Sequence, residues 1–240
     1  MPVRAILVVI SGLLALLLSA CATTNLYQSA PAGRFDGVLL VMWVGEGQSG
    51  AGDGKFVFVP DPANPLTFTR SNAALPGAVV RPGTMYTDGG SIPKIAQLFT
   101  GLSPWGYAPA YMIHDWLFAA HHCIVDGSTD PIYESVRGVE FDQSGTILIE
   151  AIRTLVAENK VKDNDVAVSL VNTGVRSGTA RRYWDERGAC ARDAVSDQHL
   201  AAIAKVLSPG SQRIFRDSNS LSIAVPTGGE VAEVLTRIEF

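Results

Sequence analysis

Residues 35–44 read FDGVLLVMWV. This stretch is apolar and rich in β-branched residues, which predicts a buried strand. Shorter strands are predicted at residues 55–59 and 66–70, on either side of a proline-rich turn. Residues 78–87 are predicted to be extended as well, so the first part of the chain is rich in strands.

The sequence becomes helical after this strand-rich part. Helices are predicted at residues 110–123, 142–159, 163–183 and 196–207. Two short strand-like pieces follow, at residues 222–225 and 234–240. Because strands that precede a run of helices are typical of α+β folds, we expect a small, mostly antiparallel sheet followed by a bundle of about four helices.

Composition narrows the class of protein. Apolar residues make up 47% of the 240 positions and charged residues 18%, which suffices for a packed core and is too apolar for a disordered chain. The formal charge is −4, from 19 basic and 23 acidic residues. Since no basic excess is present to neutralise phosphates, we expect no binding to nucleic acid.

The N-terminus carries a targeting signal. Arg4 precedes an apolar run from Ala5 to Leu18, and Leu18-Ser19-Ala20-Cys21 ends this region. A run of about 14 residues is too short to span a bilayer as a helix, so it predicts a signal peptide. A cysteine directly after Leu-Ser-Ala resembles the lipobox of bacterial lipoproteins. This resemblance implies cleavage before Cys21, a diacylglyceryl group on its sulfur and an acyl chain such as palmitate on its amino group. The alternative is an ordinary secretory signal with a chance cysteine.

The predicted signal and lipidation site divide the chain into four parts. We expect residues 1–20 to be removed, residues 21–34 to form a tether, and residues 35–187 to form the main domain. Residues 188–240 are expected to form a C-terminal extension with a helix and short strands. Several acyl chains would hold the protein stably on the lipid bilayer, on the periplasmic side. The lack of an aspartate directly after Cys21 resembles outer-membrane sorting.

Two motifs resemble a known family. Tyr86-Thr87-Asp88-Gly89-Gly90-Ser91-Ile92-Pro93 is followed by Ser103-Pro104-Trp105 and then by Ile113-His114-Asp115-Trp116-Leu117-Phe118. Together they resemble the phage-associated domain-of-unknown-function family 1353, as do the later pieces Phe141-Asp142 and Val175-Arg176-Ser177-Gly178. The resemblance covers residues 35–187, and this chain departs from the family at Gly89-Gly90 and in its extension. The family implies no established activity, but it marks these residues as candidates for a shared site.

The candidate residues suit a hydrolase at the membrane or cell wall. A buried helical histidine, His114, can act as general base if a carboxylate orients its ring, and Asp142 is the candidate for that carboxylate. Asp115, with Asp88 in a glycine-rich loop, could hold a divalent cation such as calcium. This layout resembles that of secreted phospholipases A2 locally, although their disulfide-flanked motif is missing. We expect the four residues to converge, and we expect carboxylates near His114 to raise its pKa.

A structural interpretation is the alternative. His114 would then be a core histidine, Asp115 would pair with an arginine such as Arg176, Arg181 or Arg182, and Asp142 would be a helix N-cap. The protein would be a non-catalytic envelope lipoprotein in which these residues lock helices together and the surface binds a partner. A cleft above His114 would favour the hydrolase, and complete burial of His114 would favour the structural role.

Cysteines and histidines in the second half add two further predictions. Without Cys21, the chain retains Cys123 and Cys190, in a compartment that permits disulfides. A bridge between them is favoured over two free buried thiols, and it would close a loop of about 68 residues. His121 and His122 are predicted to be exposed at the end of a helix.

Overall fold

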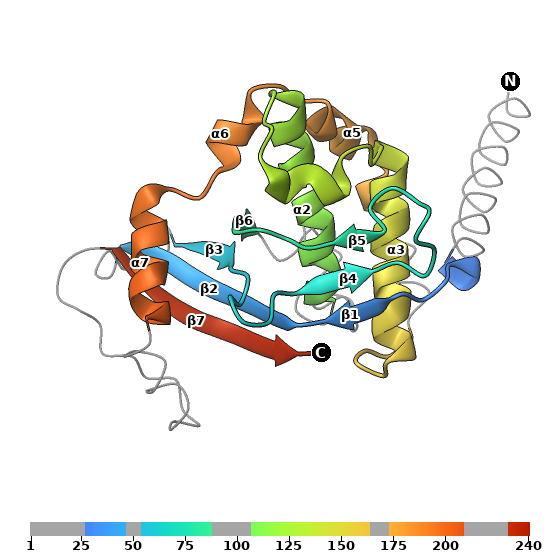
Figure 1. The fold of residues 1–240 in the computed structure, drawn as a ribbon, viewed down its shortest axis with the longest axis horizontal. Helices are drawn as coiled ribbons and strands as arrows, with labels where there is room; N and C mark the ends of the chain where they lie inside the picture. The colour runs from blue at the N-terminus through green and yellow to red at the C-terminus, as the bar shows by residue number, and fades with distance from the viewer. Residues whose placement is uncertain (1–26, 47–53, 88–106, 164–172, 209–229) are drawn as a thin grey trace, which may run out of the picture.

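The computed structural model describes residues 27–46, 54–87, 107–163, 173–208 and 230–240 (Figure 1). Its fold is α+β, as predicted, with two antiparallel sheets. The first sheet has the strand order β1-β4-β5 and the second has the order β6-β3-β2-β7. The strands are β1 (Arg34–Asp36), β2 (Val38–Glu46), β3 (Lys55–Phe58), β4 (Thr67–Thr69), β5 (Val79–Val80), β6 (Met85–Thr87) and β7 (Glu230–Glu239).

Gly37 divides the predicted strand at 35–44 into β1 and β2, which belong to different sheets. Its φ of 97° is in the left-handed region, which favours glycine. A Cβ at this position would lie 2.3 Å from the carbonyl oxygen of Pro65, so a larger residue would not fit. The single strand expected from the apolar run is therefore wrong in one respect, because the chain turns at Gly37 from one sheet into the next.

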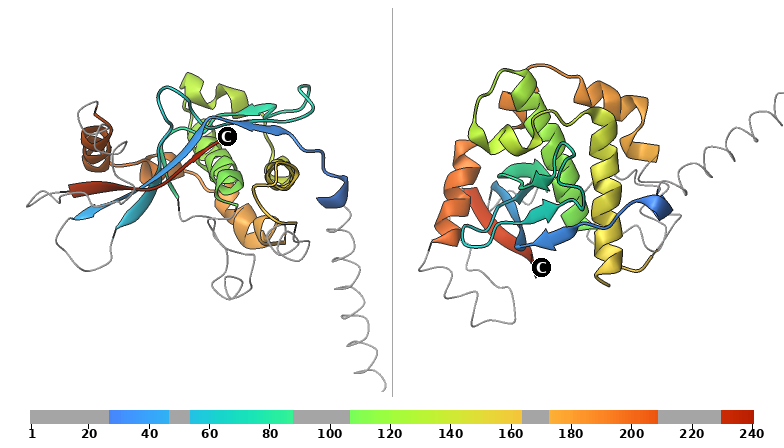
Figure 2. Two further views of the ribbon diagram at one scale, coloured as in Figure 1. Left: turned by 90° about the horizontal axis from the view of Figure 1, so that it is seen from below. Right: turned by 45° about the vertical axis from the view of Figure 1, so that its right-hand side comes forward.

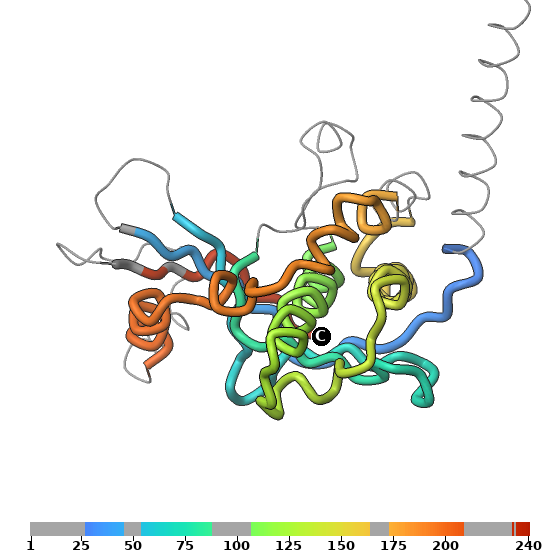
Figure 3. The backbone as a smooth tube through the Cα atoms, turned by 90° about the horizontal axis from the view of Figure 1, so that it is seen from above, coloured from blue at the N-terminus to red at the C-terminus, as the bar shows by residue number. Residues whose placement is uncertain are grey.

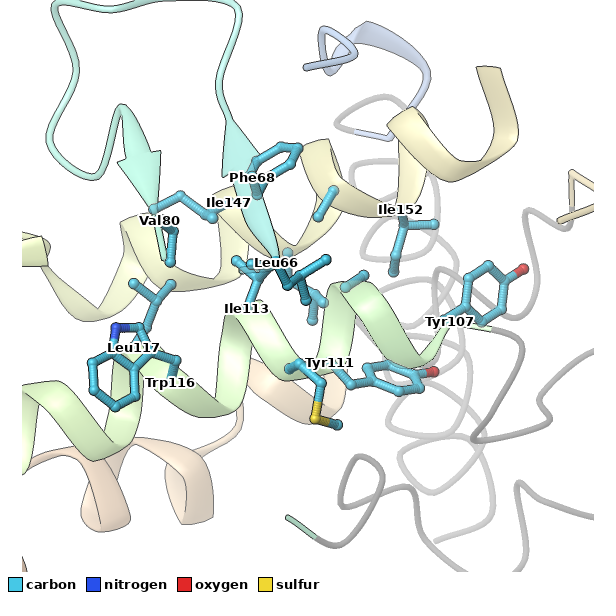
Figure 4. Packing of buried hydrophobic residues seen from close by; sticks show 14 of the residues in the cluster. Leu66, Phe68, Val80, Tyr107, Tyr111, Ile113, Trp116, Leu117, Ile147 and Ile152 are labelled. Carbon is cyan, nitrogen blue, oxygen red and sulfur yellow. The ribbon is translucent and has the colours of Figure 1, made fainter. Parts of the chain in front are cut away.

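The helices are α2 (Ala108–Val125), the short 3-10 helix η2 (Pro131–Val136), α3 (Phe141–Ala157), α5 (Gly178–Trp184), α6 (Ala189–Asp193) and α7 (Asp197–Leu207). The main core lies between α2, α3 and the three-stranded sheet, where Leu66, Ile113 and Ile147 are fully buried (Figure 4). Among the described residues, no helix is long and apolar enough to cross a membrane.

The helix predicted at 163–183 is wrong as one continuous element. The chain turns at residues 176–177, and α5 begins only at Gly178. The Ser177 side chain accepts a hydrogen bond from the backbone N–H of Ala180, which caps the new helix. The serine therefore starts a helix at a point where periodicity alone suggested the interior of one.

The described parts of the C-terminal extension, residues 188–208 and 230–240, contribute to the same fold instead of forming a separate appendage. β7 pairs with β2 in antiparallel register from Val38–Glu239 to Glu46–Glu230. Helix α7 packs beside this strand pair, at the opposite side of the molecule from α3 (Figures 2 and 3). A second apolar cluster, which includes Met42, Val57 and Ile203, lies between α7 and the sheet. The predicted strand piece at 222–225 lies outside the described residues.

A disulfide joins Cys123 at the end of α2 to Cys190 in α6, with their Cα atoms 4.5 Å apart. This is the pairing that the cysteine count favoured. The Asp126 carboxylate supports it by accepting hydrogen bonds from the backbone N–H groups of Gly188 (2.7 Å) and Cys190 (3.0 Å). The bridge and the carboxylate together fix α6 to the end of α2.

The folded part begins earlier than the predicted tether at 21–34 allowed. Tyr27 is only 2% exposed, and its hydroxyl donates a 2.6 Å hydrogen bond to Asp163. The backbone N–H of Gly33 donates to Thr154 Oγ1 of α3 at 2.7 Å. Since Tyr27 and Gly33 at its two ends are both bound to the body, the segment 27–33 is part of the folded domain and not of a free linker.

Candidate functional site

His114 lies on the buried face of α2, with its ring 4.9 Å from that of Phe118. The residue is 9% exposed, and its Nε2 is buried without a hydrogen-bond partner within the described part of the chain. Burial lowers the pKa of His114 from 6.5 to about 4, so the imidazole is neutral at physiological pH. The expectation of a raised pKa is therefore wrong, because burial removes the ring from water and disfavours its charged form.

Asp115 points in a different direction, toward the end of β6. Its Oδ2 accepts a 2.8 Å hydrogen bond from the hydroxyl of Thr87, the last residue of that strand. Neighbours on a helix project about 100° apart, which explains why His114 and Asp115 serve different surroundings. Asp115 therefore joins α2 to the sheet at the point where the chain leaves β6.

Asp142 lies at the surface, in the first turn of α3. Its side chain is 81% exposed, and its carboxylate is 3.9 Å from the guanidinium of Arg176. Among the described contacts, none joins Asp142 to His114. Asp142 is not the N-cap either, because Glu140 occupies that position and forms a capping box with Gln143. An acidic residue in the first helical turn is favourable because it faces the positive end of the helix dipole.

Only one of the two residues of the proposed cation site, Asp115, belongs to the described part of the chain. Asp88 lies outside the described residues. Within the described ranges, no three His, Cys, Asp or Glu side chains are grouped closely enough to hold a metal ion. Of the four predicted site residues, His114 and Asp115 are thus adjacent on α2, and Asp142 is exposed near Arg176. Calcium binding stays a prediction.

Tyr111 adds a second buried polar group on α2, one turn before His114. It is 3% exposed, and its hydroxyl has no hydrogen-bond partner in the described part of the structure. Burial raises the pKa of Tyr111 well above its usual value, so the phenol stays protonated. Sequence reasoning did not single out this residue, since an aromatic residue at a helical spacing is normally core.

His122 is fully buried, which contradicts the predicted exposure of this position. Its Nε2 is 2.7 Å from the carbonyl oxygen of Tyr183, and its Nδ1 is 3.1 Å from Asp193 Oδ2. Both partners are hydrogen-bond acceptors, so the ring of His122 is held from both of its nitrogen atoms. His121 is half-buried and stacks on Trp184 with ring centroids 3.9 Å apart. The two histidines thus join α2 to α5 and α6.

An ion pair deep in the core was also missed. The Arg70 guanidinium donates to both carboxylate oxygens of Glu150, at 2.7 and 2.8 Å, and also to the carbonyl of Pro76. Both side chains are almost completely buried. The available signal was Glu150 itself, a charged residue within the apolar arc of α3.

In the comparisons with known proteins, no family model, curated protein or solved structure matches the chain. The likeness to the domain-of-unknown-function family 1353 therefore stays a prediction from the quoted motifs.

Lowering the pH is expected to destabilise the protein through His114. The pKa of His114 is lowered from 6.5 to about 4 in the folded state, so protons bind more readily to the unfolded chain between these values. The contribution of His114 to the free energy of unfolding is therefore fully present above about pH 6.5 and is lost as the pH falls toward 4. The full loss is on the order of 3 kcal/mol. Urea unfolding at a series of pH values measures it. The variant His114→Leu is the control, because it should remove this part of the pH dependence while His121 and His122 stay in place. Equal pH dependence of the two proteins would contradict the assignment.

Proposed function

We propose that the chain is a lipid-anchored protein of the bacterial cell envelope, more specifically of the outer membrane, whose folded body is a non-catalytic structural or partner-binding module. The anchoring part rests on the apolar run before Leu18-Ser19-Ala20-Cys21. The non-catalytic part rests on the separation of the candidate acid–base pair. Asp142 is exposed beside Arg176, whereas His114 is buried and neutral.

The arrangement of the described polar side chains supports this proposal. A general base has to lie within hydrogen-bonding reach of the proton that it removes, directly or through one water. Within the described residues, no carboxylate is hydrogen-bonded to the buried Nε2 of His114. Two polar pairs connect secondary-structure elements. Thr87 with Asp115 joins β6 to α2, and Arg70 with Glu150 joins the end of β4 to α3. Such contacts fix how the elements pack, which is the role expected of a polar network in a rigid module.

A hydrolase that uses His114 is the second candidate function, and one observation favours it. The imidazole is neutral, and a general base requires that state. Tyr111 precedes it by one helical turn and also has a buried polar atom without a described partner. In this alternative, Asp115, which accepts a hydrogen bond from Thr87, would supply the acidic group.

An activity comparison separates the two candidates. Wild-type protein, His114→Asn and Asp142→Asn are tested against esters, phospholipids and peptidoglycan, with circular dichroism to verify that each variant is folded. We expect no turnover that depends on His114. Turnover by the wild type that is abolished in folded His114→Asn would contradict the non-catalytic proposal and establish the hydrolase. Asp142→Asn reports separately on the orienting role, and we expect it to behave as the wild type.

The anchor gives a separate prediction. Cys21→Ser is expected to move the protein from the membrane fraction to the soluble fraction, or to leave it unprocessed, because each buried methylene of an acyl chain contributes about 0.8 kcal/mol of membrane binding. Cell fractionation followed by immunoblotting measures the distribution. A conservative change next to the site, Thr23→Ser, is the control and should stay membrane-bound. Membrane association of Cys21→Ser equal to the wild type would contradict lipid anchoring.

A further inference from the structure

Tyr27 fixes the place where the chain enters the folded body. Its ring packs under the Arg153 guanidinium at 5.0 Å, and its hydroxyl is bonded to Asp163. Six residues later, Gly33 lies so close to β4 that a Cβ would be 2.3 Å from the carbonyl oxygen of Thr69. The entry segment is therefore held at the C-terminal end of α3 and cannot detach without losing these contacts.

These contacts define an anchor face, which consists of residues 27–33, the last turn of α3 (153–157) and the turn at 158–163. The start of α2 lies at the same end, because burial and the nearby Asp163 carboxylate together raise the pKa of Tyr107, the residue before that helix. The other end of α2 carries the Cys123–Cys190 disulfide and precedes η2. Figure 1 shows α2 and α3 side by side, with α5 and α6 at the end away from the anchor face.

Chain length limits how the body can sit on a membrane. Cys21 and Tyr27 are six residues apart, so their Cα atoms can be at most about 22 Å apart in any conformation. Helix α2 has 18 residues and is therefore about 27 Å long. If the disulfide end touched the bilayer with the axis of α2 perpendicular to the membrane, the anchor face would lie farther from the bilayer than residues 21–27 can reach. That orientation is excluded once Cys21 is held in the bilayer.

We infer that the anchor face lies against phospholipid headgroups and that the disulfide end of α2 points away from the membrane. This inference rests on the proposed lipidation of Cys21 and adds an orientation to it. It makes the end with α5, α6 and η2 the accessible side of the protein, and thus the side available to a partner in the periplasm.

Geometry, and not charge, supports this orientation. The anchor face contains three cations, Arg153, Lys160 and Lys162, against two carboxylates, Glu158 and Asp163. Arg153 lies 3.8 Å from Asp163, so part of this charge is already balanced within the protein. A net excess of one charge gives only about 1 kcal/mol of attraction to an anionic surface. The orientation should therefore depend little on salt or on anionic lipid.

Fluorescence quenching from the membrane surface tests the orientation. Two full-length, acylated variants, Lys162→Cys on the anchor face and Thr129→Cys beyond α2, are labelled at the new thiol with the native disulfide intact. Both replaced residues are exposed. They are reconstituted in vesicles of phosphatidylethanolamine and phosphatidylglycerol that carry a nitroxide on the headgroups. We expect several-fold stronger quenching at position 162 than at 129, with little change in high salt.

A longer tether provides the matched control. A flexible Gly/Ser insertion between Thr24 and Asn25 should bring the quenching at the two positions close together, because it removes the limit on reach. Mass spectrometry of the same samples establishes the state of Cys21. Equal or reversed quenching with the native tether and an acylated Cys21 would overturn the orientation while leaving the proposed anchoring intact. An unacylated Cys21 would overturn the anchoring and the orientation together.

Discussion

Replacing Glu150 by leucine is expected to lower the free energy of unfolding by about 3–5 kcal/mol, because it leaves the Arg70 guanidinium charged and buried without its partner. The side chains of Arg70 and Glu150 are only 3% and 5% exposed, so water cannot replace the lost contact. Leucine fills much of the space of the glutamate, which limits the contribution of a cavity. Urea unfolding followed by circular dichroism measures the change.

The double variant Arg70→Met/Glu150→Leu gives the decisive comparison. Replacing a buried ion pair by apolar residues of similar size is often close to neutral. We expect the double variant to be clearly more stable than either single variant, although it also loses the hydrogen bond from Arg70 to Pro76. If the effects of the two single changes simply add, the two side chains do not act as a coupled pair, and this part of the account is wrong.

Removing the disulfide is the second large effect. Cys123→Ala/Cys190→Ala is expected to lower the free energy of unfolding by about 4 kcal/mol in the chain-entropy model, because the two cysteines are 67 positions apart and their bridge restricts the unfolded chain. The comparison uses chemical denaturation of the double variant and of the non-reduced wild type. A reduced wild-type sample is the control and should resemble the variant. A difference below about 1 kcal/mol would contradict a stabilising bridge.

Local sequence patterns were enough to predict several strands and helices close to their observed positions. The apolar, β-branched run at 35–44 and the helix at 110–123 are close to β1–β2 and α2. The division at Gly37 was missed because it depends on contact with Pro65, which is far away in sequence. The pairing of β7 with β2 joins residues nearly 200 positions apart. No periodicity within either strand specifies that partner, so the extension seemed separate.

The candidate site was predicted less well, for physical reasons that differ among its residues. His114 was correctly expected to be packed, since apolar residues surround it on α2. Asp142 was assigned to the site because an aspartate at the start of a helix can serve either the helix dipole or a reaction, and the sequence alone does not separate these roles. His122 was assigned to the surface because its acceptors, Tyr183 and Asp193, lie on later elements whose position depends on the disulfide.

Mass spectrometry of the N-terminal peptide of the membrane-extracted protein tests the central claim, which is anchoring through Cys21, most directly. We predict a peptide that begins at Cys21, lacks residues 1–20, and carries the added mass of a diacylglyceryl group and an amino-linked acyl chain. A peptide that retains residues 1–20, or one that begins elsewhere with an unmodified Cys21, would contradict the account.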